Sequence, residues 1–307
     1  MSKNKIRILC FGEAMIEVSG VDYAQNYARI GFAGDTLNTA IYLKRLLGNQ
    51  ADIDYLTVLG EDPFSYEMKK YLKSEKIGVE KIRHVNSRMP GLYAINTDSK
   101  GERTFSYWRD MSAARLLFEF QEDYTNILGY DLIYFSGISL AILPSTIRIN
   151  LLNWIKKNRS QFEVAFDSNY RPNLWENSSS AAGFIEQAFD ICNIALPSLD
   201  DQMLLMEMRN EKSVADWFRR KGATQTILKR GLRGPRLLGK VNHEERFSTL
   251  EKIIDTTAAG DSFNAGFLSS YMLGSSMIDC AKYGHELAKV VIGHHGAICP
   301  RSAIKEL

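Results

Sequence analysis

The sequence predicts an α/β protein of three layers, in which helices cover both faces of a mainly parallel central sheet and a small β-sheet stands beside it. Short apolar segments alternate with longer amphipathic ones along most of the 307 residues, which is the pattern of strands and helices in such a protein. Two stretches depart from this alternation and carry β-rich patterns. Hydrophobic residues make up 45% and charged residues 24%, so the chain can bury a large core without disulfides.

Central strands are predicted where a short apolar run lies between turn or helix signals. In chain order they are Ile6–Phe11, Asp54–Leu59, Leu132–Phe135, Val164–Asp167, Ile191–Leu196, Thr226–Lys229 and Lys252–Ile254. A helix over Asp35–Leu47 stops at Gly48, and Asp62-Pro63 starts the next with an N-cap Asp and a Pro at the first helical position. Further helices are predicted at Ser145–Lys157, Leu199–Met208, Ser213–Lys221, Ser262–Leu273 and Ile278–His294.

The two stretches outside this alternation are Glu13–Gly34 and Arg88–Arg109. The second contains two β-rich segments around the polar turn Asp98–Gly101, which predicts a β-hairpin. We expect residues 13–34 and 88–110 to form a small sheet that acts as a lid over a site on a single domain of residues 1–307, because such lids keep water from a reacting group. The alternative is an edge hairpin without a role.

Charge and cysteine patterns exclude several classes of protein. The net charge of +2 comes from 38 basic and 36 acidic residues that are well interspersed, which argues against a nucleic-acid partner. The four cysteines show no CxxC spacing, which indicates reduced thiols rather than a zinc site. The chain starts without a signal pattern and has no apolar stretch long enough for a membrane span. We therefore expect a cytoplasmic protein with no membrane partner.

The segment from Asp255 to Asp261 carries the chemistry. Small residues between a strand and a helix N-terminus let backbone N–H groups approach an anion, and the helix dipole adds partial positive charge there. No GxxxxGK[ST] occurs, so the P-loop class is excluded. At the mouth of this anion hole, the Asp261 carboxylate can take a proton from an attacking hydroxyl. The alternative is that Asp261 only caps the helix.

Asp255–Gly266 resembles the second signature of the PfkB carbohydrate kinases, DTTGAGD-x-F-x-x-G, with Ala258 where Gly is common. Gly31–Ala40 resembles the first signature of the same family. The resemblance implies a ribokinase-like fold, with Asp261 as catalytic base. It also implies an anion hole from the amides of Ala258, Ala259 and Gly260, a magnesium or monovalent cation near Asp255, and sugar contacts from Gly34, Asp35 and Asn38.

Two arginines bear on the choice of sugar. Arg109 ends the hairpin and Arg171 follows a strand, and Arg can hold a carboxylate by two hydrogen bonds. Strings such as Gly34–Asn38, Tyr107–Arg109 and Asn169–Trp175 resemble a bacterial group within the family, the 2-keto-3-deoxygluconate kinases. That resemblance implies phosphorylation of this acid sugar at its 6-position. Its implied contacts are Gly34, Tyr93, Tyr107, Arg109, Arg171 and Asp261, with Asp167 and Asn169 nearby.

Other interpretations stay open for these residues. The arginines alone could be surface ion pairs, and the two tyrosines could be cross-strand packing. A fructokinase or other neutral-sugar kinase with the same core is the nearest alternative, and a sugar sensor without catalysis is a more distant one. Ala297 stands where some relatives have an acidic substrate contact, so that contact is not expected here.

The same resemblance implies a nucleotide-binding part of the site. It implies ATP and Mg²⁺ as cofactors, with a monovalent cation such as K⁺ as a further candidate. The strand-end loop Lys229–Gly234 is expected to contact the phosphates and ribose through Lys229, Gly231 and Gly234. Ser198 and Asp201 stand where the family has its magnesium-linked N-x-x-E element, and His285 is expected near the adenine. An exposed lid edge could also pair with a second copy of the chain, which would give a homo-oligomer.

Overall fold

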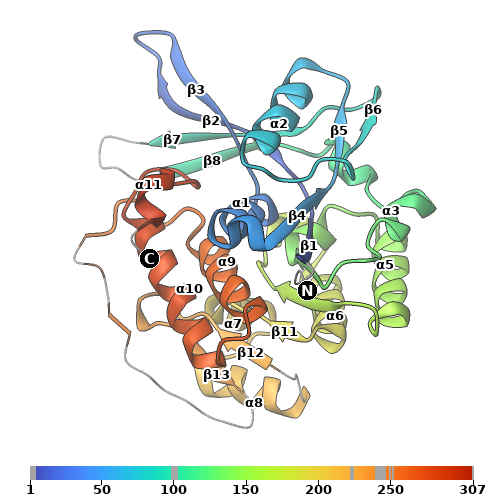
Figure 1. Cartoon of the computed structure of the whole chain (residues 1–307), viewed down its shortest axis with the longest axis vertical. Helices are drawn as coiled ribbons and strands as arrows, with labels where there is room; N and C mark the ends of the chain where they lie inside the picture. Colours follow the sequence, from blue (N-terminus) through green and yellow to red (C-terminus); the bar gives the residue numbers. More distant parts are fainter. Residues whose placement is uncertain are drawn as a thin grey trace.

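A seven-stranded sheet with the order β13-β12-β11-β10-β9-β1-β4 runs through the molecule (Figure 1). The computed structural model describes residues 5–97, 103–221, 225–238, 247, 248, 250 and 252–305. The strands of this sheet are β1 (Ile6–Phe11), β4 (Ala51–Leu56), β9 (Leu132–Ser136), β10 (Glu163–Asp167), β11 (Ile194–Ala195), β12 (Gln225–Leu228) and β13 (Arg236–Leu238). All pairings are parallel except that of β12 with β13.

Helices cover both faces of this sheet, as predicted. Side chains alternate along a strand, so Ile133 and Phe135 of β9 enter one core, whereas Leu132 and Tyr134 enter the other. The first core is closed by α5 (Ser145–Asn158), α6 (Ser178–Ile191) and α8 (Glu211–Lys221). The second is closed by α1 (Asp35–Leu47), α9 (Ala259–Met272) and α10 (Met277–Ile292). The remaining helices are α2 (Pro63–Ser74), α3 (Gln121–Thr125), α4 (Gly137–Ala141), α7 (Leu199–Leu205) and α11 (Arg301–Ile304).

The second, smaller sheet has the order β3-β2-β7-β8 and projects from the main body (Figure 1). It is built from β2 (Met15–Asp22), β3 (Tyr27–Ala33), β7 (Gly91–Thr97) and β8 (Arg103–Trp108). Only β2 and β7 pair in parallel. The two irregular stretches of the sequence therefore do come together, as predicted. The turn predicted at Asp98–Gly101 lies outside the described residues.

Three strand predictions differ from the structure. The predicted strand Asp54–Leu59 is divided, because β4 ends at Leu56 and β5 (Val58–Gly60) pairs instead with β6 (Arg83–Val85). The predicted strand Ile191–Leu196 is reduced to β11, since α6 extends to Ile191. The prediction of a strand at Lys252–Ile254 is wrong. The N–H groups of Ile254 and Asp255 bond the Ile292 carbonyl at the end of α10, at 2.9 and 3.1 Å, rather than a neighbouring strand.

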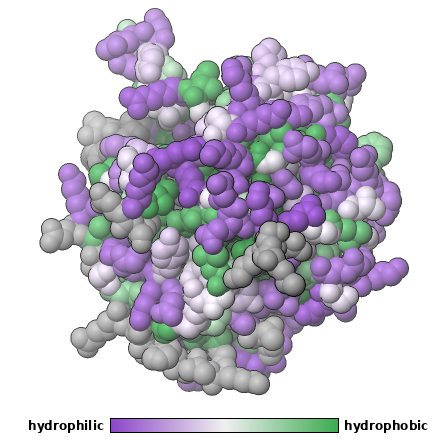
Figure 2. Space-filling model, viewed as in Figure 1, coloured by the Kyte–Doolittle hydropathy of each residue, from purple (hydrophilic) through white to green (hydrophobic). Residues whose placement is uncertain are grey.

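The face of the surface seen in Figure 2 is mainly hydrophilic, and the cysteines lie inside the protein. On the face shown in Figure 2, most of the coloured residues are hydrophilic, and the hydrophobic ones are scattered among them. All four cysteines are buried as free thiols. No helix in the described part of the chain has the length and apolar character of a membrane span.

Candidate active site

A cavity of about 830 Å³ lies where the small sheet meets the carboxyl ends of the main-sheet strands. In an α/β sheet this edge is the usual place for a ligand. Every predicted site residue except Asp255 lines the cavity. These are Gly34, Asp35, Asn38, Tyr93, Tyr107, Arg109, Asp167, Asn169, Arg171, Ser198, Asp201, Lys229, Gly231, Gly234, Ala258, Ala259, Gly260, Asp261 and His285.

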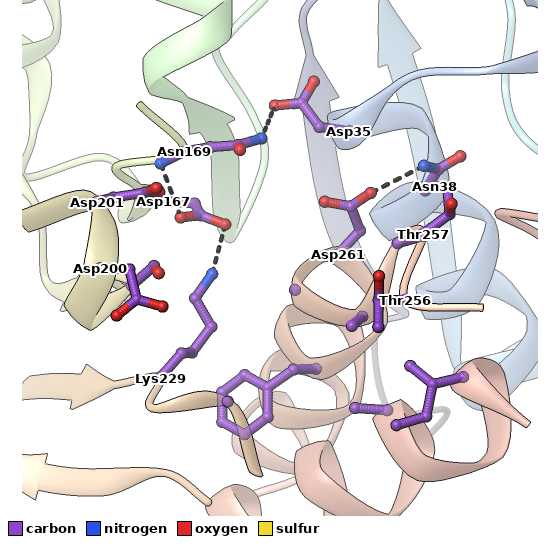
Figure 3. Close-up of a pocket in the computed structure, with 18 of the residues that line it drawn as sticks. Asp35, Asn38, Asp167, Asn169, Asp200, Asp201, Lys229, Thr256, Thr257 and Asp261 are labelled. Carbon is purple, nitrogen blue, oxygen red and sulfur yellow. Dashed lines mark hydrogen bonds and ion pairs between the residues drawn. The ribbon is translucent and has the colours of Figure 1, made fainter. Parts of the chain in front are cut away.

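Asp261 lies in the first turn of α9, at the floor of this cavity (Figure 3). The helix starts after Ala258, whose φ of 59° lies in the left-handed region. The Ala258 carbonyl accepts the first hydrogen bond of the helix, from Ser262 N at 2.9 Å. The Ala259 N–H donates to the Thr256 carbonyl at 3.2 Å, so the N–H groups after Ala258 that can bind an anion are those of Gly260 and Asp261, which have no carbonyl partner within the helix. The Asp261 carboxylate accepts a hydrogen bond from Asn38 Nδ2 of α1 at 2.8 Å.

The surroundings of Asp261 raise its pKa to about 8. Loss of solvent is the largest cause, and the negative charges of Asp35 and Asp167 add to it. The hydrogen bond from Asn38 and the charge of Lys229 act in the opposite direction. A base is most effective when its pKa lies near the working pH, so this carboxylate is suited to accept a proton near neutrality.

Asp35, the first residue of α1, and Asn169, two residues after β10, meet near Asp261 (Figure 3). Asp35 Oδ2 accepts from Asn169 Nδ2 at 2.8 Å and from the Ser136 hydroxyl. Gly34 is required just before Asp35, because a Cβ there would lie 2.2 Å from the carbonyl oxygen of Glu13. The chain can therefore bring Asp35 against the end of β1 only with glycine at position 34.

Lys229, at the end of β12, belongs to a buried network that sequence reasoning did not foresee. Its Nζ donates to Asp167 Oδ2 at 2.6 Å and to Asn264 Oδ1 at 3.2 Å. Asn264, fully buried one turn into α9, donates to the same Asp167 oxygen at 2.6 Å and to the Tyr134 hydroxyl at 2.9 Å. A Cβ at Gly260 would lie 3.6 Å from Lys229 Nζ. The ammonium group therefore stands next to the anion hole.

The acidic side chains of Asp200 and Asp201 lie at the start of α7, across the cavity from Asp261 (Figure 3). Burial and the neighbouring Asp167 raise the pKa of Asp201, while Arg171 lowers it. Among the described residues, no group of three or more His, Cys, Asp or Glu side chains could hold a metal. Two carboxylates nevertheless fit a magnesium ion that takes its other ligands from water and phosphate oxygens.

Two carboxylates that sequence reasoning did not assign to the site lie in or before the small sheet: Glu13 is buried in the loop before β2, and Glu17 is partly buried on β2. Glu17 accepts a hydrogen bond from the Tyr93 hydroxyl, and Glu13 pairs with Arg109. One oxygen of Glu13 and the Nε of Arg109 are buried without a partner in the structure, and both residues line the cavity. Glu13 directly follows the first strand and its glycine, and this position at a carboxyl strand end was the available signal. Tyr107 remains 55% exposed over the opening.

The two predicted arginines therefore differ in their surroundings. Arg109 is buried and forms an ion pair with Glu13, whereas the side chain of Arg171 is half exposed. The nearest acid to Arg171 is Asp201, with 3.8 Å between Nη1 and Oδ1. Arg171 thus has more of its donor capacity open toward a ligand.

The far end of the cavity combines a glycine loop with apolar side chains. Gly231 and Gly234 have φ of 57° and 73°, which glycine adopts without a steric cost. His285 Nε2 lies 2.7 Å from the Ser248 carbonyl, and its ring lies against Phe247. Around them the cavity is lined by Leu250, Ile253, Ala288 and Ile292. The faces of a flat aromatic base fit such a slot.

Asp255 lies outside the cavity lining, and its carboxylate is already engaged. Oδ1 accepts from Arg103 and from Thr257 N at 2.9 Å, and Oδ2 accepts from Gly296 N at 2.5 Å. Burial raises the pKa of Asp255, but these donors outweigh it and hold the pKa below the usual value. The assignment of Asp255 to a metal remains a prediction, and these contacts do not favour it.

Comparisons with known proteins find relatives over nearly the whole chain. Residues 5–303 match the pfkB family carbohydrate kinases. The chain is 39% identical over 310 residues to the 2-dehydro-3-deoxygluconokinase of Dickeya dadantii, covering 97% of this chain and 98% of that protein. It is 38% identical over 309 residues to the protein of the same name from Escherichia coli K12, with the same coverage. The fold resembles that of a Vibrio cholerae fructokinase solved with fructose, ADP and calcium, with a TM-score of 0.84 and 18% identity over 97% of this chain and 96% of that one.

Proposed function

Because the chain belongs to the pfkB family of carbohydrate kinases, we propose that it phosphorylates 2-keto-3-deoxygluconate, also called 2-dehydro-3-deoxygluconate, with ATP. The product is 2-keto-3-deoxy-6-phosphogluconate. The names of the relatives at 38% and 39% identity support this substrate. The observation that carries the proposal is the cavity itself, which is lined by Asp261 and the N-terminal residues of α9 together with Arg171 and the glycine loop.

In the proposed reaction, the 6-hydroxyl oxygen of the sugar forms a bond to the γ-phosphorus of ATP while the bond to the β-phosphate oxygen breaks. Asp261 accepts the hydroxyl proton, and ADP leaves with the electron pair of the broken bond. Phosphoryl transfer depends mainly on positioning and on stabilising negative charge, so the N–H groups after Ala258 and the ammonium of Lys229 are expected to contribute most.

The divalent metal that the family implies would be held by Asp200 and Asp201 together with the phosphates. When bound, it would neutralise phosphate charge. Asp201 stays close to Arg171, whose Nη1 donates to the Tyr170 carbonyl at 3.0 Å and whose half-exposed guanidinium would turn its other donors toward a carboxylate of the sugar. Asp35 and Asn169 are hydrogen-bonded to one another and are placed to bond sugar hydroxyls.

The small sheet, with Tyr93 and Tyr107, would act as the lid. We also propose that the reaction takes place in the cytoplasm and that the edge of the small sheet can pair with a second copy of the chain.

The test is ADP release with MgATP, comparing 2-keto-3-deoxygluconate, its galactonate epimer, fructose and ribose at equal concentration. We expect strong preference for an acid sugar. A preference for fructose would favour the neutral-sugar kinase, which the pairing of Arg109 with Glu13 makes the second candidate. Absence of turnover with every sugar would favour the sensor.

The role of Asp261 is tested with Asp261→Asn, which keeps the hydrogen bond with Asn38 possible but removes the base. We expect turnover to fall by about 100-fold to 10,000-fold, the usual contribution of a positioned base, with little change in ATP binding. Asp110→Asn, an exposed acid outside the cavity lining, is the matched control. Near-normal turnover of Asp261→Asn would remove Asp261 from its role.

A further inference from the structure

The carboxylate of Asp255 is occupied by protein donors on both of its oxygens. Its side chain is 1% exposed, and its carboxylate accepts hydrogen bonds from Arg103, Thr257 N and Gly296 N. The adjacent Ile292 carbonyl already accepts from both Ile254 N and Asp255 N. The oxygens that a cation at this place would need are therefore engaged in bonds within the chain.

Arg103 supplies the positive charge at this position. It comes from β8 of the small sheet, and its Nη1 donates to Thr257 Oγ1 at 3.2 Å as well as to Asp255. Its side chain is 23% exposed, so the ion pair is largely shielded from solvent and is stronger than a surface pair. Asp255 and Thr257 directly precede Ala258, where the anion hole begins. One guanidinium thus joins the small sheet to the segment that shapes the phosphate site.

These contacts do not fit a monovalent cation such as K⁺ beside Asp255. A cation there would face the guanidinium charge and would have to displace Arg103 from the carboxylate. We propose that Arg103 takes the place of that cation, holds the segment from Asp255 to Thr257 in its binding shape, and makes nucleotide binding and turnover independent of K⁺. This inference concerns the phosphate site and rests on the proposed function only for its turnover measurement.

The first experiment uses the unaltered protein and measures the rise in melting temperature caused by ADP with Mg²⁺. It compares potassium chloride with tetramethylammonium chloride at equal ionic strength, and it repeats the comparison for turnover with whichever sugar is accepted. We expect equal values in both salts, with turnover within about twofold, or less than about 0.5 kcal/mol in barrier. A loss of more than about tenfold in turnover without K⁺, or ADP stabilisation that needs K⁺, would overturn the inference.

The second experiment tests the charge of Arg103. We expect Arg103→Gln to weaken ADP binding and lower turnover by about tenfold or more, the effect of losing a charged hydrogen bond of about 1.5 kcal/mol. Arg103→Lys should retain most of both, because it keeps a cation near Asp255. Arg29→Gln, an exposed arginine on β3 of the same sheet, is the control and should be unchanged. Unchanged ADP binding in Arg103→Gln, or a Lys variant as weak as the Gln variant, would contradict the proposal.

The rise in melting temperature caused by ADP is measured without any sugar. It therefore tests the role of Arg103 separately from the proposed sugar kinase activity. If no sugar is turned over, the proposed function fails, while the ADP measurement still decides the role of Arg103. If Arg103→Gln does not fold, the comparison of salts on the unaltered protein decides it.

Discussion

At the scale of single residues, Ala258 occupies a backbone conformation that favours glycine. Its φ of 59° places Cβ close to the following carbonyl, which costs an L-residue roughly 1–2 kcal/mol. The related signature carries glycine at this position, and the Ala in this chain keeps the same turn at that cost. The proposed anion hole is thus built on a slightly strained residue.

We therefore expect Ala258→Gly to stabilise the protein, by about 1 kcal/mol after the greater flexibility of glycine in the unfolded chain is subtracted. Urea unfolding followed by circular dichroism measures this. Ala259→Gly, in the helical conformation one residue later, is the control and should destabilise by about 0.5–1 kcal/mol. Destabilisation by both substitutions would show that Ala258 is not strained.

Asp261 should make stability depend on pH. In the unfolded chain its carboxyl ionises near its ordinary pKa of about 4, whereas in the folded chain it keeps its proton until about 8. Between these values the folded state binds more protons, so this group lowers stability as the pH rises. We expect the stability of Asp261→Asn relative to the unaltered protein to increase across this range.

The measurement is the free energy of unfolding in urea for both proteins at a series of pH values. The difference should be small at the acid end, where both side chains are neutral, and should level off above about pH 8. A difference that is constant over the whole range would mean that the pKa of Asp261 is not raised.

At the scale of elements, α9 does two things at once. Its N-terminus forms the proposed anion hole, and one turn later Asn264 holds both Lys229 and Asp167 from the neighbouring strand ends. The residues that the network joins are separated by up to 130 positions in the chain, the distance from Tyr134 to Asn264. The positioning of Lys229 next to Gly260 therefore depends on a side chain that does not line the cavity.

Replacing Asn264 with Leu, which has a similar volume, should remove both contacts and leave Lys229 poorly positioned. We expect turnover to fall by about tenfold or more, because a buried hydrogen-bonded charge loses a partner. The apparent affinity for ATP should fall less than turnover. The control is Ser269→Ala on the same helix, whose hydroxyl bonds only the Gly266 carbonyl among the described contacts. Equal losses in both variants would indicate a general effect on α9.

Local pattern and family resemblance predicted much of the architecture. The three layers follow from apolar periodicity, and the small sheet follows from the two β-rich stretches that depart from it. Family resemblance selected the 19 predicted site residues that line one cavity, and those at strand ends meet because the strand ends of a parallel sheet lie at one edge. The strand predicted at Lys252–Ile254 failed because its partner is a helix carbonyl, which no periodicity reveals. Glu13 and Asn264 were missed because their partners are distant in sequence, and the Arg103 contact with Asp255 spans 152 positions.

At the scale of the whole molecule, the site belongs to neither sheet alone. The main sheet supplies Asp167 and Lys229 at its strand ends, while the small sheet supplies Tyr93, Tyr107 and Arg109. Arg103 connects the two parts through Asp255. A movement of the small sheet would therefore alter both the part of the cavity lined by Tyr93, Tyr107 and Arg109 and the segment that precedes α9.

The burial of all four cysteines has a practical consequence. Burial raises the pKa of Cys10, Cys280 and Cys299, and raises that of Cys192 to about 12. The thiolate is the reactive form, so these side chains are protected both by their surroundings and by their protonation. An alkylating reagent gains access only when the fold opens around a given cysteine. The rate at which each thiol is labelled would then measure how fast its own region of the fold opens, with no probe added to the chain.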